Sequence, residues 1–174
     1  TMAHVKVVRR SMRPEEWTDL RFVWLQRGIY EEKFEITDLE IRDARQISED
    51  QYEYYSDEYR PLKKDDMYFT PDGTAFIRGH VQIPAHMKGK NIYFTLHTAA
   101  EMIVKINGKY VGGVDPNRER ILLNPYIDSD DLTIEIEAYN RSKPDDERNP
   151  ASLAHRGCRQ IFEGAYLSTI RDNV

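Results

Sequence analysis

NIYFTLHTAAEMIVKINGKYVGGVDPNRERILL, residues 91–123, is the stretch that decides the fold class of this chain. Two runs within it, 92–96 and 102–106, alternate β-branched or aromatic residues with polar ones, a period that is typical of strands with one buried face. After the second run the chain must reverse. Asn107-Gly108 is the dipeptide best able to adopt positive φ at both central positions of a type I′ turn. The sequence therefore predicts a tight β-hairpin at this point.

The residues after the hairpin turn redirect the chain and carry polar side chains. Gly112-Gly113 leaves two positions without side chains, so the backbone can bulge there or approach a neighbour closely. Asp115-Pro116 then turns the chain away, and the loop 115–120 concentrates Asp, Asn and Arg side chains. This loop is the part of the hairpin region richest in side chains that can bind a ligand.

Further strand patterns occur on both sides of this stretch. The turn signal PDG, residues 71–73, precedes a run over 74–83 that alternates apolar and polar residues. Residues 29–47 keep such an alternation only with a slip at 37–38, which indicates one or two strands broken by a turn. Residues 131–139, DLTIEIEAY, predict a half-buried strand. In that strand we expect Leu132, Ile134, Ile136 and Ala138 to point inward, and Thr133, Glu135 and Glu137 to point outward.

The N-terminal part of the chain has a helical pattern. Residues 14–27, PEEWTDLRFVWLQR, place Trp17 and Trp24 near the helical period, behind a proline and two glutamates that suit a first turn. We therefore expect an N-terminal helical extension over residues 1–30 and one β-sandwich domain over residues 31–174. The apolar stripe of the helix is expected to pack on the sandwich, the alternative being a membrane or a partner.

Three segments leave alternatives open. Residues 48–66 combine high charge with tyrosines, and they suit either a solvated loop or a sugar-stacking surface, since tyrosine offers an apolar face and a polar tip. Residues 140–157 indicate a long excursion that is either functional or disordered. Residues 158–170 fit a helix or a strand. The tyrosines of the first segment are Tyr52, Tyr54, Tyr55 and Tyr59.

Composition narrows the class of protein. The chain has 174 residues, 40% of them hydrophobic, which suffices for one substantial core. Its 25 basic and 30 acidic residues give a net charge of −5, which offers no electrostatic footprint for nucleic acid or an anionic membrane. No apolar run reaches the roughly 18 residues of a membrane helix. The single cysteine, Cys158, allows no internal disulfide, so we expect a cytoplasmic location.

The hairpin region also resembles a known family. Residues 100–123, with the Ile106-Asn107-Gly108-Lys109 turn, Gly112-Gly113 and the loop 115–118, look like the N-terminal β-sandwich of α-mannosidases of glycoside hydrolase family 38, of the bacterial and cytosolic type. The resemblance extends over about residues 73–170. It implies an all-β fold, an antiparallel sandwich of the jelly-roll, galactose-binding-domain-like kind, and it favours a closing strand over residues 163–170.

The resemblance has further implications for the whole protein. In such enzymes a domain of this kind precedes a catalytic domain that hydrolyses α-mannosidic bonds with retention and holds one zinc ion. The zinc and the carboxylate nucleophile would then lie outside this chain, which we expect to be an excised fragment. Its partners would be its own catalytic domain and α-mannosides, with an oligomer interface as a further role and no nucleic acid or membrane.

No catalytic or metal-binding constellation is visible in the sequence. The five histidines are scattered, and there is no H-E-x-x-H or paired-cysteine pattern. His97 is expected to hydrogen-bond with Glu101 across the bend between two strands. The pair Glu135 and Glu137 lies on an outward face and is expected to be solvated. Cys158 is expected to be a buried structural thiol.

The loop 115–120 therefore supplies the candidate binding residues. Asp115, Asn117 and Arg118 carry carboxylate, amide and guanidinium groups that can hydrogen-bond vicinal sugar hydroxyls, so we predict that they bind substrate. The alternative is a locally stabilised Asx-turn with Arg118 paired at the surface.

These observations favour a non-catalytic domain of an α-mannosidase that acts as a scaffold or shapes the active-site entrance. Two other hypotheses remain: a stand-alone carbohydrate-binding module that uses the tyrosines of 48–66, and a small hydrolase in its own right.

Overall fold

The structure, a computed structural model, describes residues 28–49, 51–68, 73–98, 100–139 and 160–171. The chain divides into two units, residues 1–32 with 170–174 and residues 33–169. Of the first unit only residues 28–32 and 170–171 are described, and there the backbone N–H of Arg171 donates to the carbonyl of Ile29 at 2.9 Å. The predicted helix over 14–27, the excursion over 140–157 and Cys158 lie outside the described residues. The domain boundary at residue 30 stays a prediction.

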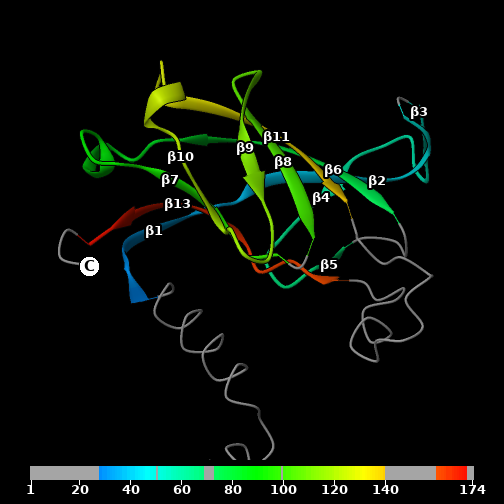
Figure 1. Cartoon of the computed structure of the whole chain (residues 1–174), viewed down its shortest axis with the longest axis horizontal. Helices are drawn as coiled ribbons and strands as arrows, with labels where there is room; N and C mark the ends of the chain where they lie inside the picture. Colours follow the sequence, from blue (N-terminus) through cyan, green and yellow to red (C-terminus); the bar gives the residue numbers. More distant parts are fainter. Residues whose placement is uncertain (1–27, 50, 69–72, 99, 140–159, 172–174) are drawn as a thin grey trace, which may run out of the picture. The chain divides into compact units, whose positions relative to one another are not determined.

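The larger sheet has seven antiparallel strands in the order β3-β2-β6-β11-β8-β9, with β4 also paired to β2 (Figure 1). Its central strands are long and meet over most of their length, since β6 pairs with β11 from Thr74↔Tyr139 to Gln82↔Asp131. The strands are β2 (Asp38–Ser48), β3 (Gln51–Tyr54), β4 (Arg60–Pro61), β6 (Thr74–Gln82), β8 (Glu101–Ile106), β9 (Lys109–Val114) and β11 (Asp131–Tyr139).

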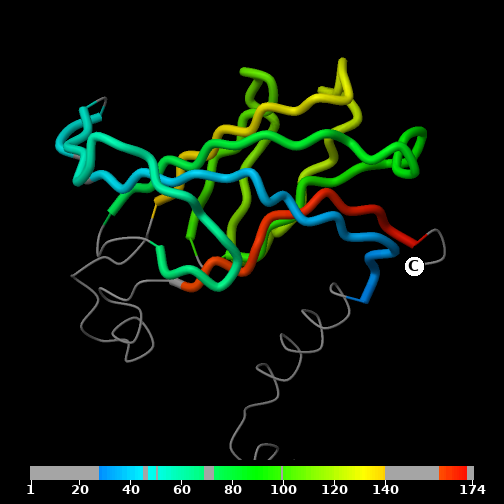
Figure 2. The backbone as a smooth tube through the Cα atoms, turned by 180° about the vertical axis from the view of Figure 1, so that it is seen from behind, coloured from blue at the N-terminus to red at the C-terminus, as the bar shows by residue number. Residues whose placement is uncertain are grey.

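The smaller sheet has four strands in the order β1-β13-β7-β10, seen from behind in Figure 2. They are β1 (Tyr30–Ile36), β7 (Tyr93–Leu96), β10 (Arg120–Leu122) and β13 (Ala165–Ile170). A short ribbon pairs β5 (Met67–Tyr68) with β12 (Gln160–Ile161), and two 3-10 turns, η1 (Ala85–Met87) and η2 (Asn124–Tyr126), lie in connections. No helix among the described residues is long and apolar enough to cross a membrane.

One apolar core joins the two sheets, so the chain is an antiparallel β-sandwich, as predicted. Side chains from the larger sheet, such as Ile41, Ile77 and Ile134, belong to the same cluster as Phe94 and Leu167 from the smaller one. In β11 the burial alternates as expected. The four predicted inward residues are 0–2% exposed: Leu132, Ile134, Ile136 and Ala138.

The predicted hairpin is confirmed at Asn107-Gly108. Both residues have positive φ, 51° and 76°, as a type I′ turn requires. The turn is also tied to β11, because the side-chain Oδ1 of Asn107 accepts the backbone N–H of Thr133 at 2.8 Å. The predicted irregularity at the following glycines occurs as well: the register of β8 and β9 shifts at Val104/Lys105, and Gly112 has φ of 149°.

Three expectations outside the hairpin have clear outcomes. The segment 29–47 forms two strands, β1 and β2, separated at Thr37, and the last segment forms the strand β13 rather than a helix. The prediction of a solvated loop over 48–66 is wrong for residues 51–54 and 60–61, which pair with β2 as strands β3 and β4. The high charge of residues 48–66 concealed the strand pattern, because an edge strand such as β3 needs only one apolar face.

Candidate ligand-binding face

The outer face of the larger sheet carries a row of alternating charges across four strands. Glu40 of β2 is the cross-strand partner of Arg78 of β6, which faces Glu135 of β11, which in turn faces Lys105 of β8. The Arg78 Nε donates to Glu40 Oε2 at 2.9 Å. Opposite charges at directly facing positions stabilise a sheet modestly and hold long side chains in place. The outward position predicted for Glu135 is confirmed.

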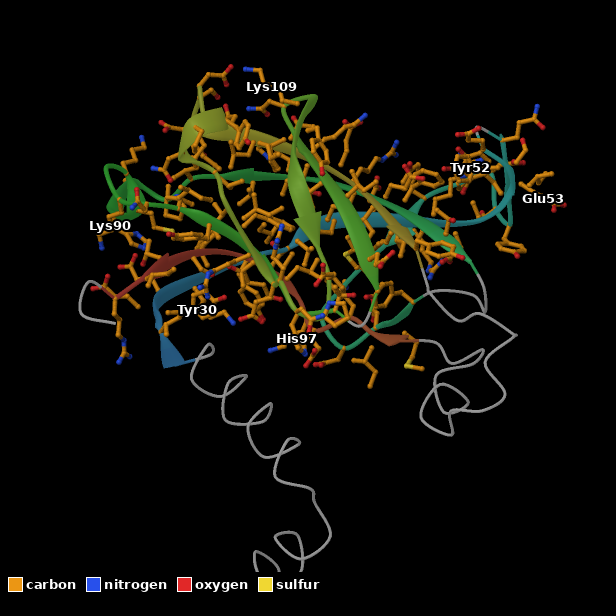
Figure 3. The ribbon with its side chains drawn as sticks, in the orientation of Figure 1. Tyr30, Tyr52, Glu53, Lys90, His97 and Lys109 are labelled. Atoms are coloured by element: carbon orange, nitrogen blue, oxygen red, sulfur yellow. The ribbon has the colours of Figure 1, made fainter. Side chains whose placement is uncertain are left out.

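Aromatic side chains pack beside this row. The ring of Tyr52 stands edge-on to Phe76 with centroids 5.0 Å apart, and the ring of Tyr54 lies 5.8 Å from the same partner. The hydroxyl of Tyr52 donates to Glu137 Oε1, and the guanidinium of Arg42 lies 3.5 Å over the ring of Tyr54. Tyr52 lies at the β3 edge of the sheet, while Lys109 marks the tip of the β8–β9 hairpin (Figure 3). These two tyrosines are therefore used, at least in part, within the fold.

Two pockets lie on this face and adjoin each other. The first has a volume of about 260 Å³ and the second about 340 Å³. Both are lined by Ile103 of β8 and Glu137 of β11, which are direct cross-strand partners. We call them the β6-side pocket and the β9-side pocket. The β6-side pocket is lined by Tyr59, Phe76, Ile77, Arg78, Ile103, Lys105, Glu135, Ile136 and Glu137.

The β9-side pocket combines exposed rings with planar polar groups. Tyr110 of β9 is 62% exposed and Tyr139 of β11 is 40% exposed, and the two strands flank β8. An exposed tyrosine offers an apolar face for stacking and a hydroxyl for hydrogen bonding. The pocket is lined by Glu101, Met102, Ile103, Tyr110, Gly113, Val114, Asp115, Arg118, Glu137 and Tyr139. Four of these carry carboxylate or guanidinium groups, which suit hydroxyl-rich ligands.

Two of the three predicted binding residues, Asp115 and Arg118, line the β9-side pocket, and Asn117 does not. The structure also shows the Asx-turn that was the alternative: Asp115 Oδ1 accepts the backbone N–H of Asn117 at 2.7 Å, and the backbones of Asp115 and Arg118 pair at 2.9 and 3.1 Å. Among the described residues, Arg118 has no ion-pair partner, so its guanidinium is available to a ligand. A role of Asp115, Asn117 and Arg118 in substrate binding stays a prediction.

Sequence reasoning missed the two tyrosines of the β9-side pocket. The signal was present, because Tyr139 continues the outward positions Glu135 and Glu137 of β11, and Tyr110 directly follows the hairpin turn. Of the four tyrosines in residues 48–66, Tyr59 lines the β6-side pocket, with the guanidinium of Arg78 3.7 Å over its ring, and the other three line neither the β6-side nor the β9-side pocket. Tyr55 is 53% exposed and lines neither pocket.

A second group of polar residues surrounds His97. The structure places two carboxylates at the ring: Nδ1 lies 3.4 Å from Glu119 and Nε2 lies 3.4 Å from Glu163. Both partners are distant in sequence: Glu119 directly precedes β10, and Glu163 lies between β12 and β13. The pair with Glu101 stays a prediction. No group of three or more His, Cys, Asp or Glu side chains within the described ranges is arranged to hold a metal. These residues therefore do not offer a ligand set for zinc.

Tyr68 lies near this group and yields a pH prediction. Its hydroxyl is 3.2 Å from Thr98 Oγ1, the residue is 1% exposed, and burial raises the pKa of the phenol to about 12 from 10.0. Between these two values the unfolded chain loses the proton while the folded chain keeps it. The contribution of the protonated Tyr68 to the free energy of unfolding is therefore complete below pH 10. It falls as the pH rises above 10, by up to ~1.4 kcal/mol per pH unit.

We expect this loss to disappear in Tyr68→Phe. Urea unfolding of the unchanged chain and of Tyr68→Phe between pH 8 and 11.5 measures this loss. Subtracting one free energy of unfolding from the other removes the contributions of the titrating groups that both proteins share. Above pH 10 the free energy of unfolding of the unchanged chain should fall relative to that of Tyr68→Phe; parallel curves would contradict the assigned pKa.

Comparison with known proteins gives a limited result. No family model and no curated protein matches the chain. Among solved structures, it resembles a calcium-binding mutant of Bacteroides uniformis beta-glucuronidase 2 (TM-score 0.48) and a beta-D-glucuronidase of Dictyoglomus thermophilum (TM-score 0.45), each at 15% identity. The matches cover 79% and 82% of this chain, which spans only 18% and 30% of those proteins. Similarity at this level does not identify a family.

The fold and the face together define the chain as an antiparallel β-sandwich with an open, aromatic and charged sheet surface.

Proposed function

We propose that this chain is a non-catalytic β-sandwich domain of a glycosidase and that it recognises carbohydrate on the outer face of its larger sheet. The observation that carries the proposal is the β9-side pocket, where two exposed tyrosine rings adjoin carboxylate and guanidinium groups. Ligand sites of this kind combine an apolar surface with a few polar groups that fix orientation. Sugars match it, because they present a C–H face to a ring and hydroxyls to planar polar groups.

The more specific proposal is that the parent enzyme is an α-mannosidase. It is supported by the hairpin region, in which Asn107-Gly108 forms the turn, Gly112 forms the irregularity, and Asp115 and Arg118 reach the β9-side pocket. The domain would then scaffold a catalytic domain and shape the entrance to its active site. The zinc ion and the nucleophile of that enzyme would belong to the catalytic domain, and the parent protein would be cytoplasmic.

A second candidate is a stand-alone carbohydrate-binding module. One observation favours it: the described residues that line the two pockets all come from residues 33–169, which suits binding by this domain alone. Both candidates predict sugar binding by the isolated chain. They differ in whether the binding changes the activity of an attached catalytic domain.

Calorimetric titration of the chain with α-linked manno-oligosaccharides tests the proposal. We expect saturable binding that the double variant Tyr110→Ala/Tyr139→Ala weakens by at least about tenfold, since removing the two rings removes the stacking surface. Tyr55→Ala is the matched control, because Tyr55 is exposed but lines neither pocket, and it should bind as the unchanged chain does.

Two results would contradict the proposal. One is the absence of saturable binding, which would leave no role for the face in sugar recognition. The other is hydrolysis of an aryl α-mannoside by the purified chain that is lost in Asp115→Ala, which would make the chain an enzyme.

A further inference from the structure

The two pockets of the candidate face meet at a single cross-strand pair, Ile103 of β8 and Glu137 of β11. On each side of this pair, the next cross-strand pair of β8 and β11 lines one of the pockets. Lys105 and Glu135 line the β6-side pocket. Glu101 and Tyr139, which are also cross-strand partners, line the β9-side pocket. The pockets therefore follow one another along the direction of β8 and β11.

The spacing of the pockets follows from strand geometry. Residues that share one face of a strand are two positions apart, which is roughly 6.8 Å. Along β11, Glu137 lies between Glu135 and Tyr139, and the cross-strand pair that contains Glu137 is common to both pockets. One pocket is thus displaced from the next by a step comparable to one sugar unit of a glycan chain.

Each pocket has its own aromatic and polar groups. The β9-side pocket has the two exposed rings and the guanidinium of Arg118. The β6-side pocket has Tyr59 and Arg78, and the guanidinium of Arg78 is held in place by Glu40 at 2.9 Å and by the ring of Tyr59 at 3.7 Å. An arginine has five N–H donors, so the bond to Glu40 leaves most of them for a ligand.

Charge further restricts the ligand. Arg78 and Lys105 balance Glu135 and Glu137 in the β6-side pocket. In the β9-side pocket three carboxylates, from Glu101, Asp115 and Glu137, face one guanidinium. The combined surface has no excess of positive charge, so an uncharged chain suits it better than a polyanionic one.

We propose that this face is a two-subsite groove that takes an uncharged oligosaccharide along β8 and β11, with the first sugar in the β9-side pocket and the next in the β6-side pocket. The inference rests on the proposed function and adds the class of ligand and its direction. The β9-side pocket is the primary subsite because its rings are the more exposed and the guanidinium of Arg118 is not engaged within the described residues. The β6-side pocket adds affinity only for a longer ligand.

The test compares methyl α-mannoside with an α-linked mannotriose by calorimetry on the full chain and three tyrosine variants. The trisaccharide should bind at least about tenfold more tightly than the monosaccharide, which corresponds to 1.4 kcal/mol. Tyr59→Ala should remove most of this advantage and leave the monosaccharide affinity unchanged. Tyr110→Ala should weaken both ligands, and Tyr55→Ala neither.

The outcomes separate the inference from the proposed function. Equal affinities for the two ligands, or a Tyr59→Ala variant that weakens both alike, would overturn the two-subsite groove while leaving sugar recognition intact. Binding of neither ligand would overturn both. Thermal unfolding of each variant shows that it is folded, and Lys105→Ser is a second variant at the β6-side pocket with the same expected pattern as Tyr59→Ala.

Discussion

Gly79→Ala is expected to lower the free energy of unfolding by about 3 kcal/mol, or to prevent folding altogether. A Cβ atom at this position would lie 2.1 Å from the carbonyl oxygen of Asp38 and 2.6 Å from a methyl carbon of Leu39. The carbonyl belongs to the backbone of β2 and cannot rotate away, because β2 and β6 pair throughout this region, with Leu39 opposite Gly79. Relief of the clash would require separating two central strands.

Chemical denaturation of this variant beside Gly28→Ala gives the measurement. A Cβ atom at Gly28 would meet nothing within 4 Å, so that substitution makes the same chemical change without a clash. A Gly79→Ala protein within about 1 kcal/mol of Gly28→Ala would contradict the close approach of β2 and β6. The pairing also matters for the β6-side pocket, because it holds Glu40 against Arg78.

The parts of the fold that could be predicted are those encoded by local patterns. The strand 131–139 has the predicted bounds and burial because its alternation is strict and each of its faces has one kind of environment. The hairpin at Asn107-Gly108 follows from the φ angles that this dipeptide tolerates. Neither prediction needs knowledge of distant residues.

The candidate site could be predicted only in part, because it is assembled from four strands. The loop 115–118 was found through its chemistry, yet its neighbours Tyr110 and Tyr139 belong to strands that meet β8 from opposite sides. Nothing local specifies that β8 lies between β9 and β11. The same reason applies to the surroundings of His97, because Glu119 and Glu163, which lie 3.4 Å from its ring nitrogens, come from distant sequence positions.

Phe94→Ala is expected to lower the free energy of unfolding by about 3–5 kcal/mol, because it removes a fully buried ring and leaves a cavity. Phe94 is 0% exposed at the centre of the smaller sheet, with Ile121 of β10 and Leu167 of β13 as its cross-strand partners. Its ring belongs to the core cluster that both sheets share. The loss should therefore weaken the whole sandwich and not one edge of it.

Phe34→Ala is the matched control, since Phe34 makes the same chemical change at a strand position that is 41% exposed. It should cost no more than about 1 kcal/mol by urea denaturation. Equal losses for the two variants would contradict a core shared between the sheets. Tyr110→Ala completes the comparison: its ring is 62% exposed on the opposite surface of the larger sheet, so it should leave stability nearly unchanged while weakening sugar binding. Stability and recognition would then be assigned to different parts of the molecule, namely the core between the two sheets and the outer face of the larger sheet.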